Sequence, residues 1–359
     1  MKRLGNLFPE IASFENLLAA AKDAAKGKRF RDPVFQFNFD LERNLFDLQR
    51  DLQEKTYQPG SYKTFVIHDP KRRMISAAPF RDRVVHHALC RVIEPVLEPT
   101  YIFDSYANRK GKGSHRALER FKSFARRYKY ILRCDIRKYF PSMDHEILKE
   151  KIRRKIKCPE TLWLLDTIVD SSNPQEPVYH LFQGDDLFTP LERRHGLPIG
   201  NLTSQYFAIV YLNDFDHWVK ETLGCKAYLR YVDDFALFDN DKDRLVEWKA
   251  RVVERVEEER LRLHQIKSQI HATRKGCEFV GFRVLPTRVR VGRKALVRAK
   301  KRINELKAAY ARGEVDLGRV HNSIQSWVAH LRYGDTYRLR EDLSEDWVFQ
   351  RAATGEALG

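Results

Sequence analysis

The chain has 359 residues, 43% of them hydrophobic, and a formal net charge of +17. This size and apolar content predict a fully folded protein of two or three subdomains, and the charge predicts a polyanionic partner. No apolar run approaches the roughly 20 residues of a membrane span, so no membrane partner is expected. The five cysteines include no CxxC pair and the first residues lack a signal-peptide core, so we expect neither zinc nor disulfides and a cytoplasmic location.

The N-terminal part begins with a predicted amphipathic helix over residues 14–22, which ends in the basic turn 26–29. A second basic turn, residues 71–73, leads into a predicted strand. Arginine can bind a phosphate group through two parallel hydrogen bonds, which lysine cannot do. Exposed charge alone indicates general RNA binding by these cations; a specific role in phosphate binding is implied only by the family resemblance given below.

An aspartate ends the strand-like run of residues 130–135. A helix is expected to begin near Ser142 or Asp144, because both residue types are good N-caps and apolar residues then recur every four positions. The recurring residues are Leu148, Ile152 and Ile156. Asp135 is thus predicted at the C-terminal end of a strand, just before a turn into a helix.

The segment 195–205 reads HGLPIGNLTSQ and precedes a predicted long helix. Aromatic residues mark one face of that helix, and Gly224 is expected to end it as a C-cap. The aromatic residues are Phe207, Tyr211, Phe215 and Trp218. Gly200 would allow the backbone to approach a base pair closely, because glycine has no Cβ.

Two adjacent carboxylates, Asp233 and Asp234, lie between two short apolar runs in segment 226–238. These runs are expected to pair as strands, which leaves the aspartates at the tip of a hairpin. Paired negative charge there is unfavourable unless a cation binds, and Mg²⁺ prefers carboxylate oxygens. Together with Asp135, the pair could hold two metals about 3.5–4 Å apart for phosphoryl transfer. For the other Asp-Asp pair, Asp185-Asp186, we expect a solvated loop.

The C-terminal part opens with a basic stretch between Arg283 and Arg302 that contains no acidic residue. Two helices are predicted after it. The first carries an apolar stripe of Leu296, Ala299, Ile303, Leu306 and Tyr310, and the second carries Val320, Ile324, Trp327 and Leu331. A charge run is normally a solvated face. The family resemblance given below places this run after the primer grip and implies phosphate contacts, which are strong and not specific for sequence.

The segment 231–234, Tyr-Val-Asp-Asp, resembles the YxDD box of reverse transcriptases, and residues 135–140 resemble the first catalytic motif of that family. Other segments resemble further motifs of the family in the same order. They are residues 57–60, 81–85 and 103–111 for the fingers, 263–267 for the triphosphate lysine and 276–282 for the primer grip. The resemblance implies an α+β, right-hand polymerase fold. It implies an N-terminal helix and fingers over residues 1–125, a palm over 126–286 and a helical thumb with a tail over 287–359.

By this resemblance, the protein synthesises DNA from dNTPs on an RNA template with a DNA or RNA primer. The catalytic residues would be Asp135, Asp233 and Asp234, and the metal positions would add Ile136 and hold two Mg²⁺ ions, with Mn²⁺ as a substitute. The implied substrate-binding residues are Phe140 as the gate against ribonucleotides, Tyr139, Arg73, Lys71, Arg81, Ile199, Gly200, Gln205 and Lys267. The implied nucleic-acid-binding residues are Tyr231, Lys110, Lys112, Gly281, Arg288, Arg290, Arg293 and Lys294.

Segment 199–205 indicates which group of reverse transcriptases the chain resembles. Most reverse transcriptases have Gln-Gly where this chain has Ile199-Gly200, and Ser-Pro where it has Ser204-Gln205. The pattern resembles enzymes of diversity-generating retroelements, which miscopy template adenines. That kinship implies an oligomeric accessory variability protein as partner. Ile209 departs from the Asn usual there, so a defence-associated enzyme copying a dedicated non-coding RNA is the alternative. A maturase-like RNA-binding protein is a further alternative, disfavoured because all three carboxylates are present and we expect no added domain after the thumb.

Overall fold

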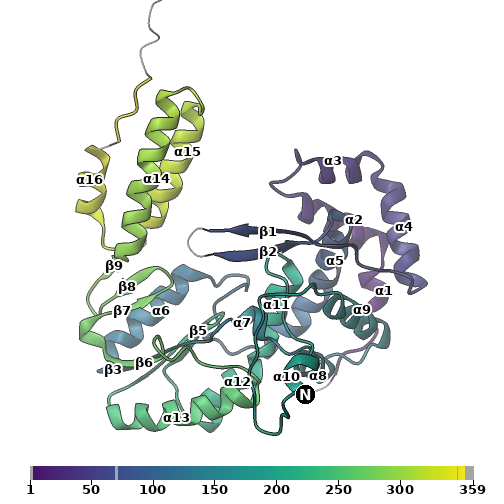
Figure 1. Ribbon diagram of the computed structural model, residues 1–359, viewed down its shortest axis with the longest axis horizontal. Helices are drawn as coiled ribbons and strands as arrows, with labels where there is room; N and C mark the ends of the chain where they lie inside the picture. Colours follow the sequence, from purple (N-terminus) through teal and green to yellow (C-terminus); the bar gives the residue numbers. More distant parts are fainter. Residues whose placement is uncertain (1–2, 69–71, 346, 352–359) are drawn as a thin grey trace, which may run out of the picture.

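The computed structural model describes residues 3–68, 72–345 and 347–351. Figure 1 shows a helical N-terminal part with a projecting two-stranded ribbon, a central part built on an antiparallel sheet, and a C-terminal part led by long helices. The N-terminal elements are α1 (Phe8–Ile11), α2 (Phe14–Ala25), α3 (Asp32–Phe39), α4 (Leu41–Gln53), β1 (Lys63–Ile67), β2 (Arg73–Ala77), α5 (Phe80–Leu97) and the 3₁₀ turn η1 (Glu98–Thr100). The arrangement is the right-hand polymerase fold, with fingers, palm and thumb in that order.

The palm alternates helices with the strands of its sheet. Its first elements are α6 (Ser114–Arg127), β3 (Tyr130–Asp135), α7 (Tyr139–Ser142), α8 (His145–Arg153), α9 (Pro159–Asp170), α10 (Thr189–Glu192) and α11 (Leu202–Tyr211). They are followed by α12 (Asn213–His217), the π-helix η2 (Trp218–Thr222), β4 (Tyr228–Tyr231), β5 (Asp234–Asp239), α13 (Lys242–Glu258), β6 (Gln269–Ala272) and the 3₁₀ turn η3 (Thr273–Lys275). The C-terminal elements are β7 (Cys277–Phe279), β8 (Phe282–Val284), β9 (Val289–Val291), α14 (Arg293–Ala311), α15 (Leu317–Leu331) and α16 (Tyr337–Glu345).

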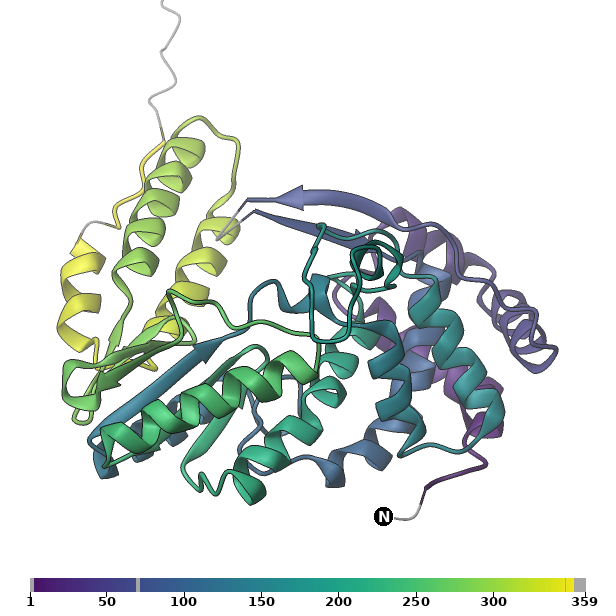
Figure 2. The ribbon, with the colours of Figure 1, turned by 60° about the horizontal axis from the view of Figure 1, so that its bottom comes forward.

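The palm sheet has the order β4-β5-β3-β6, and all its pairings are antiparallel. Strands β3, β4 and β5 are largely buried on both faces, whereas the edge strand β6 exposes one face. On one face, Leu132 and Phe235 pack into the main core beneath α13, which lies across the sheet in Figure 2. On the other face, Ile131 and Phe238 pack against α6 and the small sheet β7-β8-β9. This two-sided burial fixes the register, since a slip of one residue would exchange the two faces.

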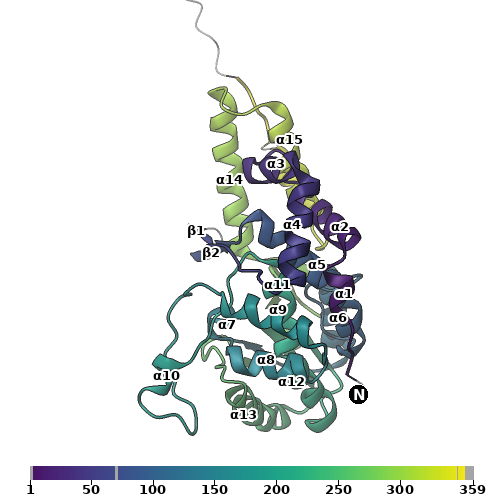
Figure 3. The same ribbon diagram turned by 90° about the vertical axis from the view of Figure 1, so that its right-hand side faces the viewer.

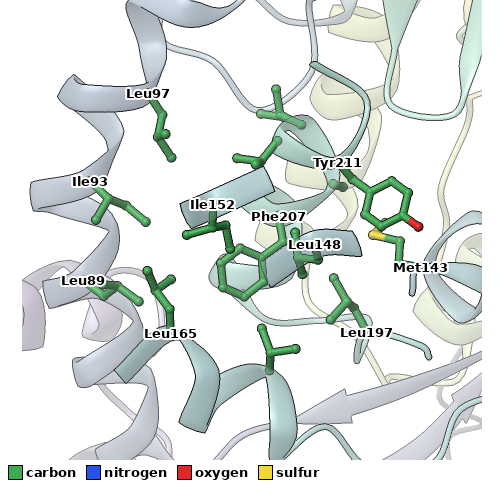
Figure 4. Close-up of a cluster of buried hydrophobic side chains, with 14 of the residues drawn as sticks. Leu89, Ile93, Leu97, Met143, Leu148, Ile152, Leu165, Leu197, Phe207 and Tyr211 are labelled. Atoms are coloured by element: carbon green, nitrogen blue, oxygen red, sulfur yellow. The ribbon is translucent and has the colours of Figure 1, made fainter. Parts of the chain in front are cut away.

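The main core joins fingers to palm. Figure 4 shows Leu89 and Ile93 of α5 facing Ile152 of α8 and Phe207 of α11. Burying large aliphatic and aromatic side chains contributes about 1.5–3 kcal/mol each. The fingers and palm are therefore a continuous unit, and α5 is the element that ties them together.

Several predicted boundaries are confirmed, and each is set by local chemistry. The amphipathic helix is α2, capped by Ser13 Oγ, which accepts from the Asn16 N–H. Asp144 caps α8 by accepting from the N–H groups of Glu146 and Ile147. Gly224 ends the helical run after the 195–205 segment with a positive φ of 76°.

Other expectations were wrong. The predicted long helix is three consecutive segments, α11, α12 and η2, because the α-helical geometry breaks at Leu212. The thumb helices begin at Arg293 rather than near 287, because residues 289–291 pair with β8 as β9. Asp185 is not in a solvated loop: Arg193 pairs with it and buries its carboxylate, while Asp186 caps α10. Figure 3 shows the segment that carries α10 projecting from the palm.

The five cysteines are all buried and free. Among the described residues, no helix combines the length and apolar character that crossing a bilayer requires.

Candidate active site

The three predicted aspartates lie at one end of the palm sheet. Asp135 is the last residue of β3 and stands directly opposite Asp234, the first residue of β5. Asp233 occupies the turn between β4 and β5, and its carbonyl accepts from the Ile136 N–H at 3.1 Å. Antiparallel pairing brings the end of one strand to the start of the next. The sheet thus brings Asp135 to the adjacent pair Asp233 and Asp234, about 100 residues later in the sequence.

Each carboxylate has a different electrostatic environment. Lys267 Nζ donates to Asp135 Oδ2 at 2.7 Å. Arg133 binds Asp234 through two hydrogen bonds, from Nε to Oδ1 at 3.0 Å and from Nη2 to Oδ2 at 2.8 Å. The carboxylate of Asp233 makes no ion pair with the described residues that would offset its burial. Burial and then the Asp135 charge raise the pKa of Asp233, and burial raises the pKa of Asp234 to about 6 against the effect of Arg133.

The oxygen atoms of these carboxylates are the ligands that hard cations such as Mg²⁺ prefer. A bound cation would also offset the repulsion between the negative charges of Asp135 and Asp233. The metal-binding role of the three carboxylates stays a prediction. Within the described ranges, no three His, Cys, Asp or Glu side chains are grouped so that they could hold a metal ion. The physical reason is that Asp234 is bound by Arg133 and Asp135 by Lys267. Asp135 and Asp233 are the carboxylates that would hold a cation here, in place of the Lys267 ammonium on Asp135.

Ile136, the predicted backbone metal position, lies in an isolated antiparallel bridge with Leu263. The hydrogen bonds of that bridge run from Arg137 N–H to the Arg262 carbonyl and from His264 N–H to the Asp135 carbonyl. Ile136 sits between these bonds, and its side chain is buried in the core. Its backbone is thus held rigidly beside Asp135.

The two predicted aromatic residues after Asp135 have different surroundings. Tyr139 is only 2% exposed, and its hydroxyl donates to the Ala208 carbonyl of α11 at 2.6 Å. The ring of Tyr139 is thus enclosed by the core, and its role in substrate binding stays a prediction. Phe140 is half-buried, lies edge-on to Tyr139, and its carbonyl accepts from the Leu197 N–H. Tyr139 and Leu197 hold Phe140 in place next to the sheet end.

The segment 199–205 is bonded to the fingers ribbon. The Ile199 carbonyl accepts from the Ser76 N–H at 2.9 Å, and Asn201 bonds both Ala78 N–H and the Ser76 carbonyl. Gly200 has φ +121°, and a Cβ there would lie 3.0 Å from Ile75 Cγ2. Glycine is required by both the backbone angle and the close approach. Gln205 is exposed on the first turn of α11.

The predicted triphosphate ligands separate into two groups. The charge of Arg73, the exposed first residue of β2, is the smallest of the charges that lower the pKa of Asp233. The guanidinium of Arg81 pairs with Asp51 and Asp82 inside the fingers. The binding of a triphosphate by either arginine stays a prediction. Lys71 lies outside the described residues.

The predicted nucleic-acid residues are dispersed along the palm and thumb. Tyr231 is half-buried against the hydrophobic cluster between the palm sheet, α6 and the small sheet β7-β8-β9. Gly281 lies in the open β7–β8 turn with a φ of +89°, and Lys110 is exposed. Lys112 is partly engaged, donating to the Phe103 carbonyl at 2.7 Å. Three predicted arginines near the start of the thumb are exposed: Arg288, Arg290 and Arg293. The side chain of Lys294 lies outside the described part of the structure.

Comparison with known proteins identifies the family. The model of the family "Reverse transcriptase (RNA-dependent DNA polymerase)" matches residues 32–284, which is most of the chain. The protein belongs to the reverse transcriptase family. It is an RNA-directed DNA polymerase by that membership, which agrees with the order of motifs and with the carboxylates at the sheet end.

This reverse transcriptase is similar to two curated proteins. Protein YkfC of Escherichia coli (strain K12) is 25% identical over 297 residues, covering 70% of this chain and 73% of YkfC. The group II intron-encoded protein LtrA of Lactococcus lactis subsp. cremoris is 23% identical over 236 residues, covering 62% of this chain but only 38% of LtrA. The apo telomerase structure from Candida tropicalis has a TM-score of 0.47 at 14% identity, covering 65% of this chain and 49% of that one.

Sequence reasoning missed three residues that organise the reverse transcriptase site. Arg133 binds Asp234, Arg230 supports the turn that carries Asp233, and Asn201 joins the 199–205 segment to β2. For the two arginines a signal existed: each interrupts an apolar strand next to a catalytic motif, where a charge must have a buried partner. Nothing local distinguished Asn201, whose partners lie more than a hundred residues away.

Proposed function

We propose that this reverse transcriptase copies RNA into DNA by in-line phosphoryl transfer at the end of the palm sheet. The observation that carries the proposal is the placement of Asp135 opposite Asp234, with Asp233 in the adjoining turn. Asp135 and Asp233, with Asp234 nearby, would hold Mg²⁺, which when bound would supply a lowered pKa at the primer hydroxyl and neutralise the leaving pyrophosphate.

The roles of the other residues follow from their positions. Arg73 offers the guanidinium that can bind a triphosphate bidentately. Lys267, which donates to Asp135 Oδ2, would offer its ammonium to a phosphate oxygen. Phe140 would exclude a 2′-hydroxyl by steric contact. Ile199 and Gly200 would lie against the nascent base pair, because they are bonded to the same ribbon that carries Arg73.

We further propose that the enzyme is error-prone and works in a diversity-generating retroelement. The support is the Ile199-Gly200 and Ser204-Gln205 pattern. An aliphatic side chain at 199 cannot hydrogen-bond to a nucleotide, so a checking contact available to glutamine is absent. The template RNA would serve this element, and an oligomeric accessory protein would bind the basic surface.

The similarity to LtrA favours a second candidate, an RNA-binding protein that acts on a group II intron. One experiment separates the candidates: purification of the protein expressed from its native locus, followed by sequencing of the bound RNA and any attached cDNA. We expect cDNA with substitutions concentrated at template adenines. A bound intron without cDNA would overturn the proposal, and faithful cDNA from a compact non-coding RNA would replace it with the defence-associated function.

A further inference from the structure

A buried ion pair lies directly behind the catalytic turn. Arg230 of β4 and Asp216 of α12 are each 1% exposed, and two hydrogen bonds join them, from Nε to Oδ1 at 2.7 Å and from Nη2 to Oδ2 at 2.6 Å. The remaining terminal nitrogen of Arg230, Nη1, donates to the Val232 carbonyl at 2.9 Å. One guanidinium therefore connects the core helix α12 to the turn that contains Asp233.

The turn needs such support because its backbone is strained. Val232 has a φ of +57°, in the left-handed region that a β-branched residue rarely adopts. A conformation of this kind costs on the order of a kcal/mol or more and persists only where its surroundings hold it. Two contacts hold it here: the Val232 side chain packs on the main core, and its carbonyl accepts from Arg230.

Arg230 itself is fixed in place by its neighbours. Its N–H donates to the Asp104 carbonyl and its own carbonyl accepts from the Tyr106 N–H, while the Tyr228 hydroxyl donates to Asp216 Oδ1 at 2.6 Å. Buried ion pairs seldom add net stability, because desolvation offsets their attraction. What this pair provides is orientation. The guanidinium of Arg230 is planar and is held by Asp216 through two of its nitrogens, so its third nitrogen can bind the Val232 carbonyl in only one position.

We propose that Arg230 is a positioning residue for DNA synthesis. Locked by Asp216, it holds the left-handed turn at Val232 so that the carboxylate of Asp233 stays next to Asp135. Arg230 touches no reacting atom. The inference rests on the polymerase activity proposed above, and its test includes a measurement that does not depend on activity.

The central variant is Arg230→Lys, which keeps the charge but cannot bind both Asp216 oxygens and the Val232 carbonyl at once. We expect kcat for dNTP incorporation to fall roughly 10- to 100-fold, as for a small displacement of catalytic groups, with the KM for dNTP and the Kd for RNA within about threefold of wild type. Hydrogen exchange of the peptide covering 231–234 should become faster. The control is Lys151→Met, which removes another buried ion pair, with Glu259, that does not contact the turn.

An unchanged kcat in a folded Arg230→Lys protein would overturn the inference. So would a loss of kcat equal to that of Lys151→Met at matched melting temperature, because a general loss of stability would then explain it. If the wild-type protein makes no DNA, the proposed function fails, and hydrogen exchange alone decides whether Arg230 holds the turn.

A second variant, Val232→Gly, tests the coupling between Arg230 and the turn. Val232→Gly removes the left-handed strain, so the turn no longer depends on Arg230 for its conformation. We expect Val232→Gly to lower kcat because the turn gains freedom, and Arg230→Lys to cost less in that background than alone. Independent, multiplicative effects of the two substitutions on kcat would contradict the coupling.

Discussion

Asp233 is the residue on which the proposed chemistry depends most directly. We predict that Asp233→Asn reduces DNA synthesis below detection while RNA affinity stays within about twofold, because one carboxylate is removed and the basic surfaces are unchanged. Primer extension on an RNA template and a filter-binding assay measure the two properties. Asp186→Asn, in the exposed cap of α10, is the matched control and should behave like wild type. Extension by Asp233→Asn would refute the assignment.

Phe140 tests the choice between ribose and deoxyribose. Its ring is half-buried beside the sheet end, and the Leu197 N–H holds its backbone. We predict that Phe140→Ala raises the ratio of rNTP to dNTP incorporation by roughly tenfold or more, because the space for a 2′-hydroxyl is opened. Single-nucleotide incorporation kinetics give this ratio. Phe39→Ala, on the exposed end of α3, should leave it unchanged; equal ratios in both variants would mean that Phe140 is only a core residue.

At the scale of elements, α5 contains a buried histidine, His86, whose protonation should make the free energy of unfolding depend on pH. His86 is buried, and burial, followed by the charges of His87 and Arg83, lowers its pKa to about 3. Because the pKa is lower in the folded than in the unfolded chain, the stabilising effect is complete above the unfolded pKa near 6.5 and is lost as the pH falls below it.

We therefore predict that the free energy of unfolding falls by about 2 kcal/mol from His86 alone between pH 7 and pH 5. Denaturant titrations of wild type and His86→Leu at both pH values measure this, and the pH-dependent difference should shrink by that amount in the variant. His321→Leu, an exposed position on α15, is the control and should leave the pH dependence unchanged. The same pH dependence in all three proteins would contradict a neutral, buried His86.

The 199–205 segment is an element whose backbone and side chains can be tested separately. Its backbone is held by Ser76 and Ala78, so a new side chain at 199 should not move the segment. We predict that Ile199→Gln lowers the misincorporation frequency at template adenines, because glutamine restores a hydrogen-bonding side chain beside the base pair. Deep sequencing of products measures it. Ile199→Leu should match wild type; an unchanged error rate in Ile199→Gln would remove Ile199 from the explanation of fidelity.

At the scale of the whole molecule, the net charge of +17 favours binding to a polyanion such as nucleic acid. Three arginines around β9 and the start of α14 are exposed: Arg288, Arg290 and Arg293. Figure 1 shows β9 and α14 leading from the small sheet into the C-terminal helices. Phosphate contacts release counterions, so RNA affinity should fall steeply with salt.

We predict that changing these three arginines to glutamine reduces the slope of log Kobs against log salt concentration by about 2, since each contact with a single strand contributes about 0.7. Fluorescence anisotropy at several salt concentrations gives the slope. Lys242→Gln with Arg244→Gln, on the outer face of α13, is the control and should keep the wild-type slope. A slope unaffected by the thumb substitutions would place the RNA elsewhere.

The sequence by itself determined the features that depend on neighbouring residues. A strand that ends in Asp135, a turn that carries Asp233 and a helix capped by Asp144 all follow from patterns within a few positions, so they were predicted correctly. The family and the right-hand fold followed from the order of these motifs. The helix break at Leu212 and the strand β9 were missed, because packing against other elements overrides local preference there.

Only the tertiary structure decided which groups meet. Arg133 binds Asp234 across 101 positions and Lys267 binds Asp135 across 132, so the electrostatic state of each carboxylate depends on strand register and side-chain direction. The same long-range geometry buried Tyr139 and directed Arg81 into the fingers. The sequence pointed to the three aspartates because their motifs lie within a few consecutive residues. The partners of these aspartates were decided by the fold, because a buried charge binds whichever group the packing brings to it.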